Sequence, residues 1–193
     1  MDAVERIERL FLLHARRLVP SCLADPVTPL DHALQCALCA EECGANAALV
    51  AAALLHDIGH FIDCPPRAAG DDDVHELRAI PFLAPIFDSR VLDPIRLHVQ
   101  AKRYFVAKDP RYVANLSAAS CNALPSQGGP MSVEECKAFE QATFAHDALR
   151  LRRWDDAAKK PDHSTPPLQY YLEVVRSLAL PVVEAGAIPD TQQ

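Results

Sequence analysis

Apolar residues recur at helical spacing along most of the chain and predict a series of helices. Between Val4 and Leu18 the apolar positions repeat with the period that forms one helix face. Further helices are predicted, in chain order, at Leu30 to Cys43, Ala47 to His60, Asp88 to Gln100, Thr143 to Lys159 and Leu168 to Leu178. No stretch alternates apolar and polar residues as a half-buried strand does. The pattern therefore predicts an all-α fold.

Capping residues, glycines and prolines indicate where these helices begin and end. Gly44 is expected to stop one helix, and Asn46 to cap the next. The Ser132-Val133-Glu134-Glu135 segment is a capping-box pattern that opens another helix. Short or interrupted helices are expected at Val74 to Phe87, which contains two prolines, and at Asp109 to Leu124.

Length and composition are typical of one domain with a substantial core. The chain has 193 residues, of which 50% are hydrophobic. The formal charge of −7 argues against a nucleic-acid partner. No apolar run has the length of a membrane span, and the acidic N-terminus does not resemble a signal peptide, so we expect a cytoplasmic protein. The sequence contains no signal of an oligomeric state.

The seven cysteines are an odd number, which favours reduced thiols over a disulfide framework. Cys36 and Cys39 form a CxxC pattern, which zinc and redox sites also use. No second paired motif follows, so buried thiols are the preferred interpretation.

A histidine and an aspartate stand side by side at the end of the most apolar run. The run from Ala47 to Leu55 contains no polar side chain, and His56 and Asp57 follow it directly. A carboxylate in such a buried place requires a partner charge or a metal. Neighbouring helical residues point about 100° apart. The pair therefore suits a histidine that binds one metal and a carboxylate that bridges to a second.

The order of histidines and aspartates along the chain resembles the HD superfamily, whose helices converge on a metal site. The pattern H…HD…H…H…D is formed by His32, His56, Asp57, His75, His98 and Asp155. Imidazole and carboxylate ligands suit iron, manganese or zinc. Taken singly, each histidine is explained as well by packing or by surface exposure. The resemblance implies one helical HD domain at residues 1–180, with its core at 30–160 and a flexible tail at 181–193.

Three further segments resemble the phosphonate-cleaving branch of the HD-domain mixed-valent di-iron oxygenases. They are His98-Val99-Gln100-Ala101-Lys102-Arg103-Tyr104, the stretch from Asn115 to Met131 with its Gln-Gly-Gly-Pro, and Leu151-Arg152-Arg153-Trp154-Asp155. Members of this branch use O2 to convert 1-hydroxy-2-aminoethylphosphonate or its trimethylamino counterpart into phosphate and glycine or glycine betaine. The resemblance implies the same type of oxygenase, acting in phosphonate catabolism.

The resemblance also implies a role for each matching residue. One iron ion would be held by His32, His56, Asp57 and Asp155, and the other by His75, His98 and the bridging Asp57. The pair would be Fe(II)/Fe(III). Lys102, Ser120 and Gln127 match the family's phosphonate contacts, and all three can donate hydrogen bonds to an oxyanion. The alternatives are a solvated lysine and residues that serve turns and caps.

Two further positions, His60 and Arg152, each have two alternative roles. His60 follows His56 by one helical turn, so it would orient substrate or water, with packing as its alternative role. Arg152 is expected to pair either with a carboxylate near the site or with a surface acid.

The chain departs from the branch before the first ligand histidine. Cys22 and Asp25 stand where the family has a gating tyrosine and a glutamate. Asp25 keeps the negative charge and is the one candidate for contacting a cationic substituent of the substrate. Cys22 cannot replace a phenol, so either it binds iron as a thiolate or the gating is absent. This departure leaves open a different 1-hydroxyalkylphosphonate as substrate. The alternative function is a metal-dependent phosphohydrolase acting on a nucleotide or phosphomonoester, the reaction of most HD proteins.

Overall fold

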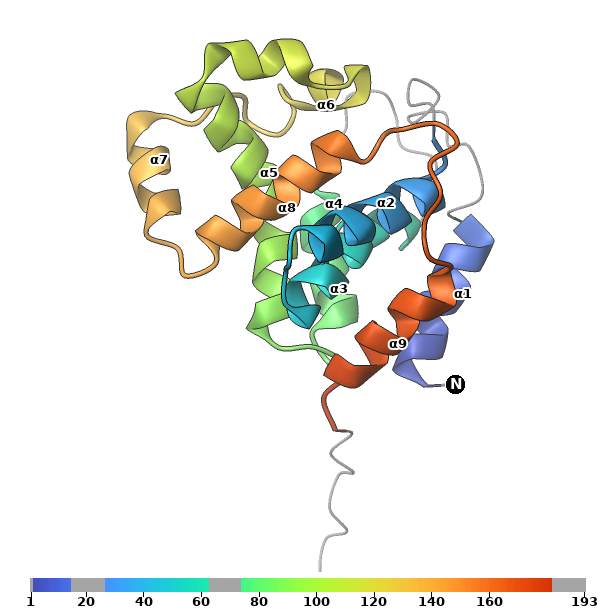
Figure 1. Cartoon of the computed structure of the whole chain (residues 1–193). Coiled ribbons are helices and arrows are strands. Elements are labelled where there is room, and N and C mark those ends of the chain that lie inside the picture. Colours follow the sequence, from blue (N-terminus) through green and yellow to red (C-terminus); the bar gives the residue numbers. More distant parts are fainter. Residues whose placement is uncertain (1, 15–26, 63–73, 182–193) are drawn as a thin grey trace, which may run out of the picture.

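The computed structural model describes residues 2–14, 27–62 and 74–181, and every regular element within these ranges is a helix (Figure 1). The elements are α1 (Ala3–His14), α2 (Pro29–Glu42), α3 (Ala47–Leu55), the 3₁₀-helix η2 (Ile58–Phe61), α4 (His75–Leu83), α5 (Ser89–Lys108), the 3₁₀-helix η3 (Pro110–Asn115), α6 (Ala118–Ala123), α7 (Val133–Glu140), α8 (Ala145–Ala157) and α9 (Leu168–Leu178). The predicted all-α fold is confirmed.

Helix α3 is the centre of the main hydrophobic core. Every residue from Ala48 to Leu55 is buried, and the helix packs against α2, α5, α8 and α9. Its alanines allow the neighbouring helices to approach closely, and its leucines fill the space between them. A helix that is apolar on all sides requires this central place, because any exposed face would leave apolar surface in water.

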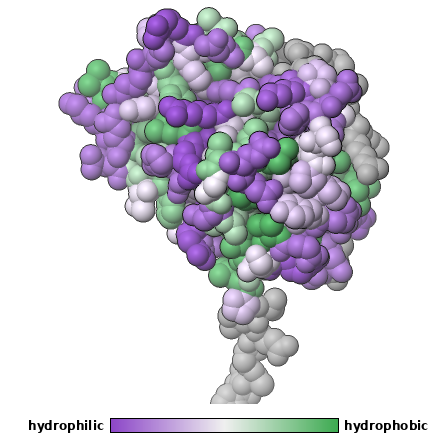
Figure 2. All heavy atoms as spheres, in the orientation of Figure 1, coloured by the Kyte–Doolittle hydropathy of each residue, from purple (hydrophilic) through white to green (hydrophobic). Residues whose placement is uncertain are grey.

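A second, smaller hydrophobic cluster joins α5, α7 and α8. Leu97 and Ala101 of α5 pack there with Phe139 of α7 and Ala148 of α8. Figure 1 shows α6 and α7 at the end of the molecule away from α1 and α9. Polar side chains cover most of the face seen in Figure 2, with small apolar patches between them. Among the described residues, no helix has the length and apolar character needed to cross a membrane.

The predicted caps are present. Asn46 accepts a hydrogen bond from the backbone N–H of Leu49, which begins α3. Ser132 and Glu135 form a complete capping box at the start of α7. Each side chain satisfies a backbone donor that the first turn of a helix leaves without a partner.

Helix α5 is longer than the sequence predicted. It was expected to end at Gln100 but continues to Lys108, because Ala101, Lys102 and Val106 extend its buried face. Pro94 lies inside this helix near its start. Of the predicted helix from Val4 to Leu18, residues 15–18 lie outside the described residues, as does the tail after 181.

The prediction of one helix from Ala47 to His60 is wrong. Helix α3 ends at Leu55, and His56 and Asp57 form a turn that leads into η2. Gly59 lies against the start of α4, so closely that an added Cβ would be 1.9 Å from the carbonyl oxygen of His75. This contact between elements determines the turn, and the helical period of the sequence does not reveal it.

Candidate metal centre

The ends and faces of five segments bring six predicted side chains to one place. His32 comes from α2, His98 from α5 and Asp155 from α8, and these are joined by His75, the first residue of α4, and by the turn after α3 with His56 and Asp57. The four histidines and Asp155 are buried, and Asp57 is partly exposed. Residues as far apart in sequence as His32 and Asp155 thus become neighbours.

Asp57 lies between two groups of ligand atoms. Its Oδ2 is 3.4 Å from His56 Nε2 and 3.8 Å from His32 Nε2. Its Oδ1 is 3.2 Å from His75 Nε2 and 3.9 Å from His98 Nε2. Each oxygen therefore faces a different pair of imidazoles, which is the arrangement of a carboxylate that bridges two metal ions.

Asp155 belongs to the group on the His32 side. Its Oδ1 lies 3.2 Å from His32 Nε2 and 3.9 Å from His56 Nε2. On the other side, His75 Nε2 and His98 Nε2 are 3.1 Å apart. The geometry thus divides the side chains into two groups, His32, His56 and Asp155 on one side of Asp57 and His75 and His98 on the other.

Hydrogen bonds turn the Nε2 atoms of three histidines toward the centre. His32 Nδ1 lies 2.8 Å from the carbonyl oxygen of Ala158. His56 Nδ1 lies 2.9 Å from the carbonyl oxygen of Ala53 in the last turn of α3, and His98 Nδ1 lies 2.7 Å from that of Ile95, one turn earlier in α5. A carbonyl can only accept, so each Nδ1 carries a proton, and Nε2 is the ring atom that faces the centre.

These imidazoles and carboxylates fit a pair of metal ions. Within the described part of the chain, the buried Nε2 of His56 has no hydrogen-bond partner. When these imidazoles are neutral, their lone pairs and the carboxylate oxygens that they face are both electron-rich, so a cation bound between them would stabilise the group. Oxygen and imidazole donors suit iron, manganese and zinc.

Asp57, Asp155 and His98 are held in the protonation states that bind metal, whereas Asp57 and Asp155 outweigh burial and raise the pKa of His56 above its ordinary value. Burial opposes the charged form of Asp57, but the neighbouring His56 and His75 hold its pKa well below the ordinary value. Burial opposes ionisation of Asp155 as well, and the Arg152 guanidinium outweighs it and lowers the pKa of that carboxyl. Burial and the nearby His75 keep the pKa of His98 well below its usual range, so its imidazole stays neutral.

His60 lies beside the second group. Its Nε2 is 4.0 Å from Asp57 Oδ1, and its ring stacks on the ring of His75 with centroids 4.0 Å apart. The expectation that His60 shares a helix face with His56 is wrong, because α3 ends before either residue. The stacking on His75 places it at the partly exposed side of the centre all the same.

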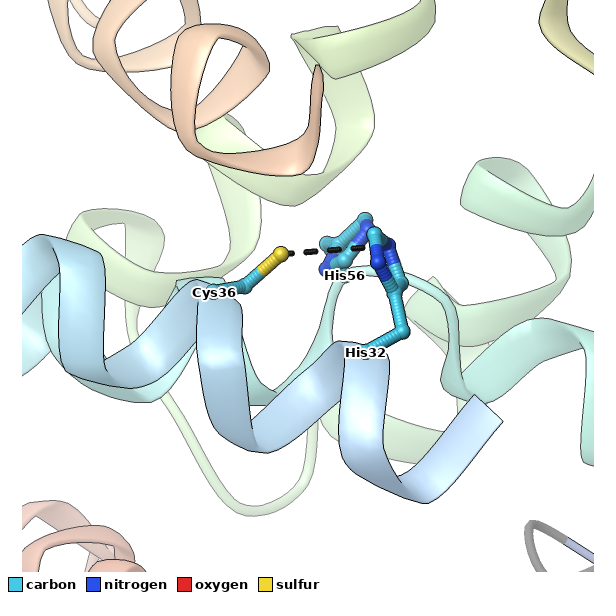
Figure 3. A group of neighbouring side chains, drawn as sticks. All are labelled: His32, Cys36 and His56. Carbon is cyan, nitrogen blue, oxygen red and sulfur yellow. Dashed lines mark hydrogen bonds between the residues drawn. The ribbon is translucent and has the colours of Figure 1, made fainter. Parts of the chain in front are cut away.

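Cys36 is a neighbour of the centre that the sequence analysis treated only as a buried thiol. It follows His32 by one turn of α2, and its Sγ lies 3.8 Å from His32 Nε2. Figure 3 shows the thiol and both imidazoles pointing into the same space. Burial, with Asp155 and Asp57 nearby, raises the pKa of Cys36 well above its ordinary value. The spacing of four residues from a ligand histidine was the available signal.

The three residues that match the family's phosphonate contacts make two separate side-chain hydrogen bonds, Lys102 with Gln127 and Ser120 with Arg152. Lys102 is buried one turn after His98, and its Nζ donates a hydrogen bond to Gln127 Oε1. Ser120 Oγ accepts a hydrogen bond of 3.2 Å from Arg152 Nη2. Arg152 pairs with two acids of its own helix: its Nη1 lies 2.6 Å from Asp155 Oδ2, and its Nη2 donates a hydrogen bond to Asp156 Oδ1. Cys22 and Asp25 lie outside the described residues.

Comparison with known proteins identifies close relatives over most of the chain. No family model matches it. The chain is 42% identical to the hydroxymethylphosphonate dioxygenase of Gimesia maris, over 90% of this chain and 88% of that protein. It is 38% identical to the glycine-betaine-forming [1-hydroxy-2-(trimethylamino)ethyl]phosphonate dioxygenase of Leisingera caerulea, over 81% of each chain. The chain therefore belongs to the phosphonate dioxygenases, the phosphonate-cleaving branch of the HD-domain oxygenases.

Proposed function

We propose that this protein uses O2 to cleave the C–P bond of a 1-hydroxyalkylphosphonate. The substrate R–CH(OH)–PO3H2 and one O2 would give the carboxylic acid R–COOH and phosphoric acid, so that both oxygen atoms are accounted for in the products. The kinship with two dioxygenases of 1-hydroxyphosphonates carries this proposal. It disfavours the alternative of a phosphohydrolase.

We assign two iron ions to the centre, as Fe(II) and Fe(III). His32, His56, Asp57 and Asp155 would hold one ion, and His75, His98 and the same Asp57 the other. When bound, the pair supplies the redox chemistry with O2, whereas the protein positions the substrate and controls charge. The bridging position of Asp57, with one oxygen toward each pair of imidazoles, supports two ions rather than one.

Lys102, Ser120 and Gln127 would bind the phosphonate group. Lys102 is 3% exposed, and a buried ammonium is a strong partner for a dianion. Its hydrogen bond fixes the orientation of the Gln127 amide, because Nζ can only donate and Oε1 must accept. Ser120 is held by Arg152, which also contacts the ligand Asp155. The phosphonate site and the metal site therefore share one buried guanidinium.

We assign Asp57 and His60 to catalysis. Asp57 would place the two ions relative to each other, and His60 lies at the partly exposed side of the second group, where it would orient substrate or water. The stacking of His60 on His75 holds its ring in that place.

The first substrate to test is hydroxymethylphosphonate, for which R is hydrogen and the products are formate and phosphate. The relative from Gimesia maris, similar over 90% of this chain, is named for this compound. Cys22 replaces the tyrosine, and Asp25 replaces the glutamate, that precede the first ligand in the branch acting on amino and trimethylamino substrates. Asp25 is the residue that we would expect to contact a cationic substituent, so the substituted phosphonates belong in the same panel.

The experiment compares three substrates with and without oxygen. Protein reconstituted with iron is mixed with hydroxymethylphosphonate, 1-hydroxy-2-aminoethylphosphonate or its trimethylamino analogue, and phosphate and the carboxylic acid are measured. Equal amounts of both products, dependent on O2, are expected. Phosphate release that persists without oxygen would contradict the oxygenase and support a hydrolase. A mixed-valent signal in electron paramagnetic resonance would support the assigned cofactor.

A further inference from the structure

Gln35 forms a paired contact with the backbone just beyond α8. Its Nε2 donates a hydrogen bond of 2.9 Å to the carbonyl of Lys160, and its Oε1 accepts one of 3.0 Å from the N–H of the same residue. The side chain is 2% exposed and comes from α2, three residues after His32. One buried amide therefore joins α2 to the segment that follows α8.

The same segment provides the hydrogen-bond acceptor that orients His32. Helix α8 ends at Ala157, and Ala158 leaves the helical conformation with φ −87° and ψ 48°. Its carbonyl, 2.8 Å from His32 Nδ1, belongs to a residue that is 1% exposed. A buried carbonyl at a helix end has no partner within its own helix, so an external donor has to satisfy it.

His32 differs in this respect from two other histidines of the centre. His56 and His98 are oriented by the carbonyls of Ala53 and Ile95, three residues earlier in the chain, so these contacts do not depend on how separate helices pack. His32 depends on a carbonyl 126 residues away in the sequence. Its orientation therefore depends on how α2 and the end of α8 are held together.

We infer that Gln35 is a positioning residue for the metal centre: by pairing with Lys160 it holds the Ala158 carbonyl on His32 Nδ1 and sets the distance between His32 and Asp155. Both of these ligands belong to the same metal position. The inference rests on the metal centre of the proposed function. Mutating a residue that hydrogen-bonds a metal-binding side chain commonly weakens metal affinity by about 10- to 100-fold. Gln35 acts one step further out, so we expect about a tenfold effect.

The test measures metal binding, without turnover. Metal-free wild-type protein and the Gln35→Met variant, which keeps the length of the side chain but neither hydrogen bond, are titrated with Mn²⁺ by equilibrium dialysis. We expect two equivalents in the wild type. In the variant, affinity for one equivalent should fall about tenfold while the other is unchanged. In spectra of protein labelled with ¹⁵N-histidine, the His32 Nδ1 proton should exchange faster with water.

Two further variants separate positioning from loss of stability. Gln35→Glu keeps the acceptor for the Lys160 N–H and should show an intermediate loss. Val175→Ala removes fully buried methyl groups of α9, far from the Lys160 contact in sequence, and should lower the melting temperature without changing either Mn²⁺ affinity. Unchanged affinity in Gln35→Met, or an equal loss at both positions, would overturn the inference.

The two proposals can fail separately. Wild-type protein that binds two Mn²⁺ ions but releases no phosphate from any phosphonate would contradict the proposed function and leave the Gln35 comparison intact. Wild-type protein that binds Mn²⁺ at neither position would overturn the inference about Gln35 together with the metal assignment.

Discussion

Arg152 Nη1 lies 2.6 Å from Asp155 Oδ2, and the other oxygen of that carboxylate, Oδ1, lies 3.2 Å from His32 Nε2. Asp155 therefore connects a buried guanidinium with the metal centre. The same guanidinium reaches Ser120 through Nη2, and its Nε donates a hydrogen bond of 3.2 Å to Tyr112 Oη. Arg152 thus contacts a ligand of the centre and a residue assigned to the phosphonate.

Replacing Arg152 by lysine should destabilise the protein even though the positive charge remains. A lysine cannot reach Asp155, Ser120 and Tyr112 at once, so hydrogen bonds to a buried carboxylate are lost, which costs about 2 kcal/mol. Denaturant unfolding of the metal-free protein measures this change. Arg153→Lys is the matched control, because Arg153 is exposed and its guanidinium lies 5.4 Å from the Phe105 ring centroid. Its free energy of unfolding should change by no more than about 0.5 kcal/mol. Equal losses in the two variants would contradict this role.

Asp57→Asn should weaken both metal positions, whereas His75→Ala should weaken one. Asp57 faces His56 with one oxygen and His75 with the other. Loss of a residue that only hydrogen-bonds a ligand weakens metal affinity by about 10- to 100-fold. Loss of a direct ligand should therefore weaken it by at least about 100-fold. Metal content after gel filtration, measured by mass spectrometry, would show the difference. An Asp57→Asn protein that keeps one full equivalent would rule out a bridging role.

Lys102→Met should weaken phosphonate binding and leave the metal content unchanged. The lost hydrogen bond to a charged group corresponds to about a 10- to 100-fold rise in KM. Lys108 lies on the same helix but is exposed and pairs with Glu140 at 2.9 Å, so Lys108→Met is the control and should leave KM unchanged. Steady-state kinetics and metal analysis of both variants test this assignment. Loss of metal from the Lys102 variant would show that it acts in some other way.

Gly59→Ala should displace α4 from the metal centre. A Cβ at this position would be 1.9 Å from the His75 carbonyl oxygen and 2.7 Å from its carbon, so the start of α4 must move. Overpacking of this kind costs about 3 kcal/mol, and affinity at the His75 position should fall with it.

Gly44→Ala is the comparison for this prediction. Gly44 has φ +65° with open space around it, so an alanine there costs about 1 kcal/mol and should not affect metal binding. Thermal unfolding and Mn²⁺ titration of both variants distinguish the two effects. Normal metal binding by the Gly59 variant would show that the turn adapts without moving His75.

Much of this protein could be predicted from local patterns in the sequence. The helical period, the Asn46 cap and the Ser132 capping box depend on residues a few positions apart, and the structure shows all of them. The apolar run before His56 predicted burial correctly for the same reason, because a continuous apolar surface can be satisfied only inside a core.

Contacts between distant segments were decided only by the tertiary structure. The order of histidines and aspartates in the sequence predicted the six residues, but their contacts with one another appear only in the fold. The end of α3 at Leu55 depends on the packing of Gly59 against α4, and the orientation of His32 depends on a carbonyl beyond α8. The contacts of Arg152 with both Asp155 and Asp156 depend likewise on how α8 is buried in the fold. The sequence by itself determined the all-α class and the approximate positions of most helices, because these follow from short-range spacing. Only the fold decided which oxygen faces which imidazole, because that distance depends on how helices far apart in the chain pack together.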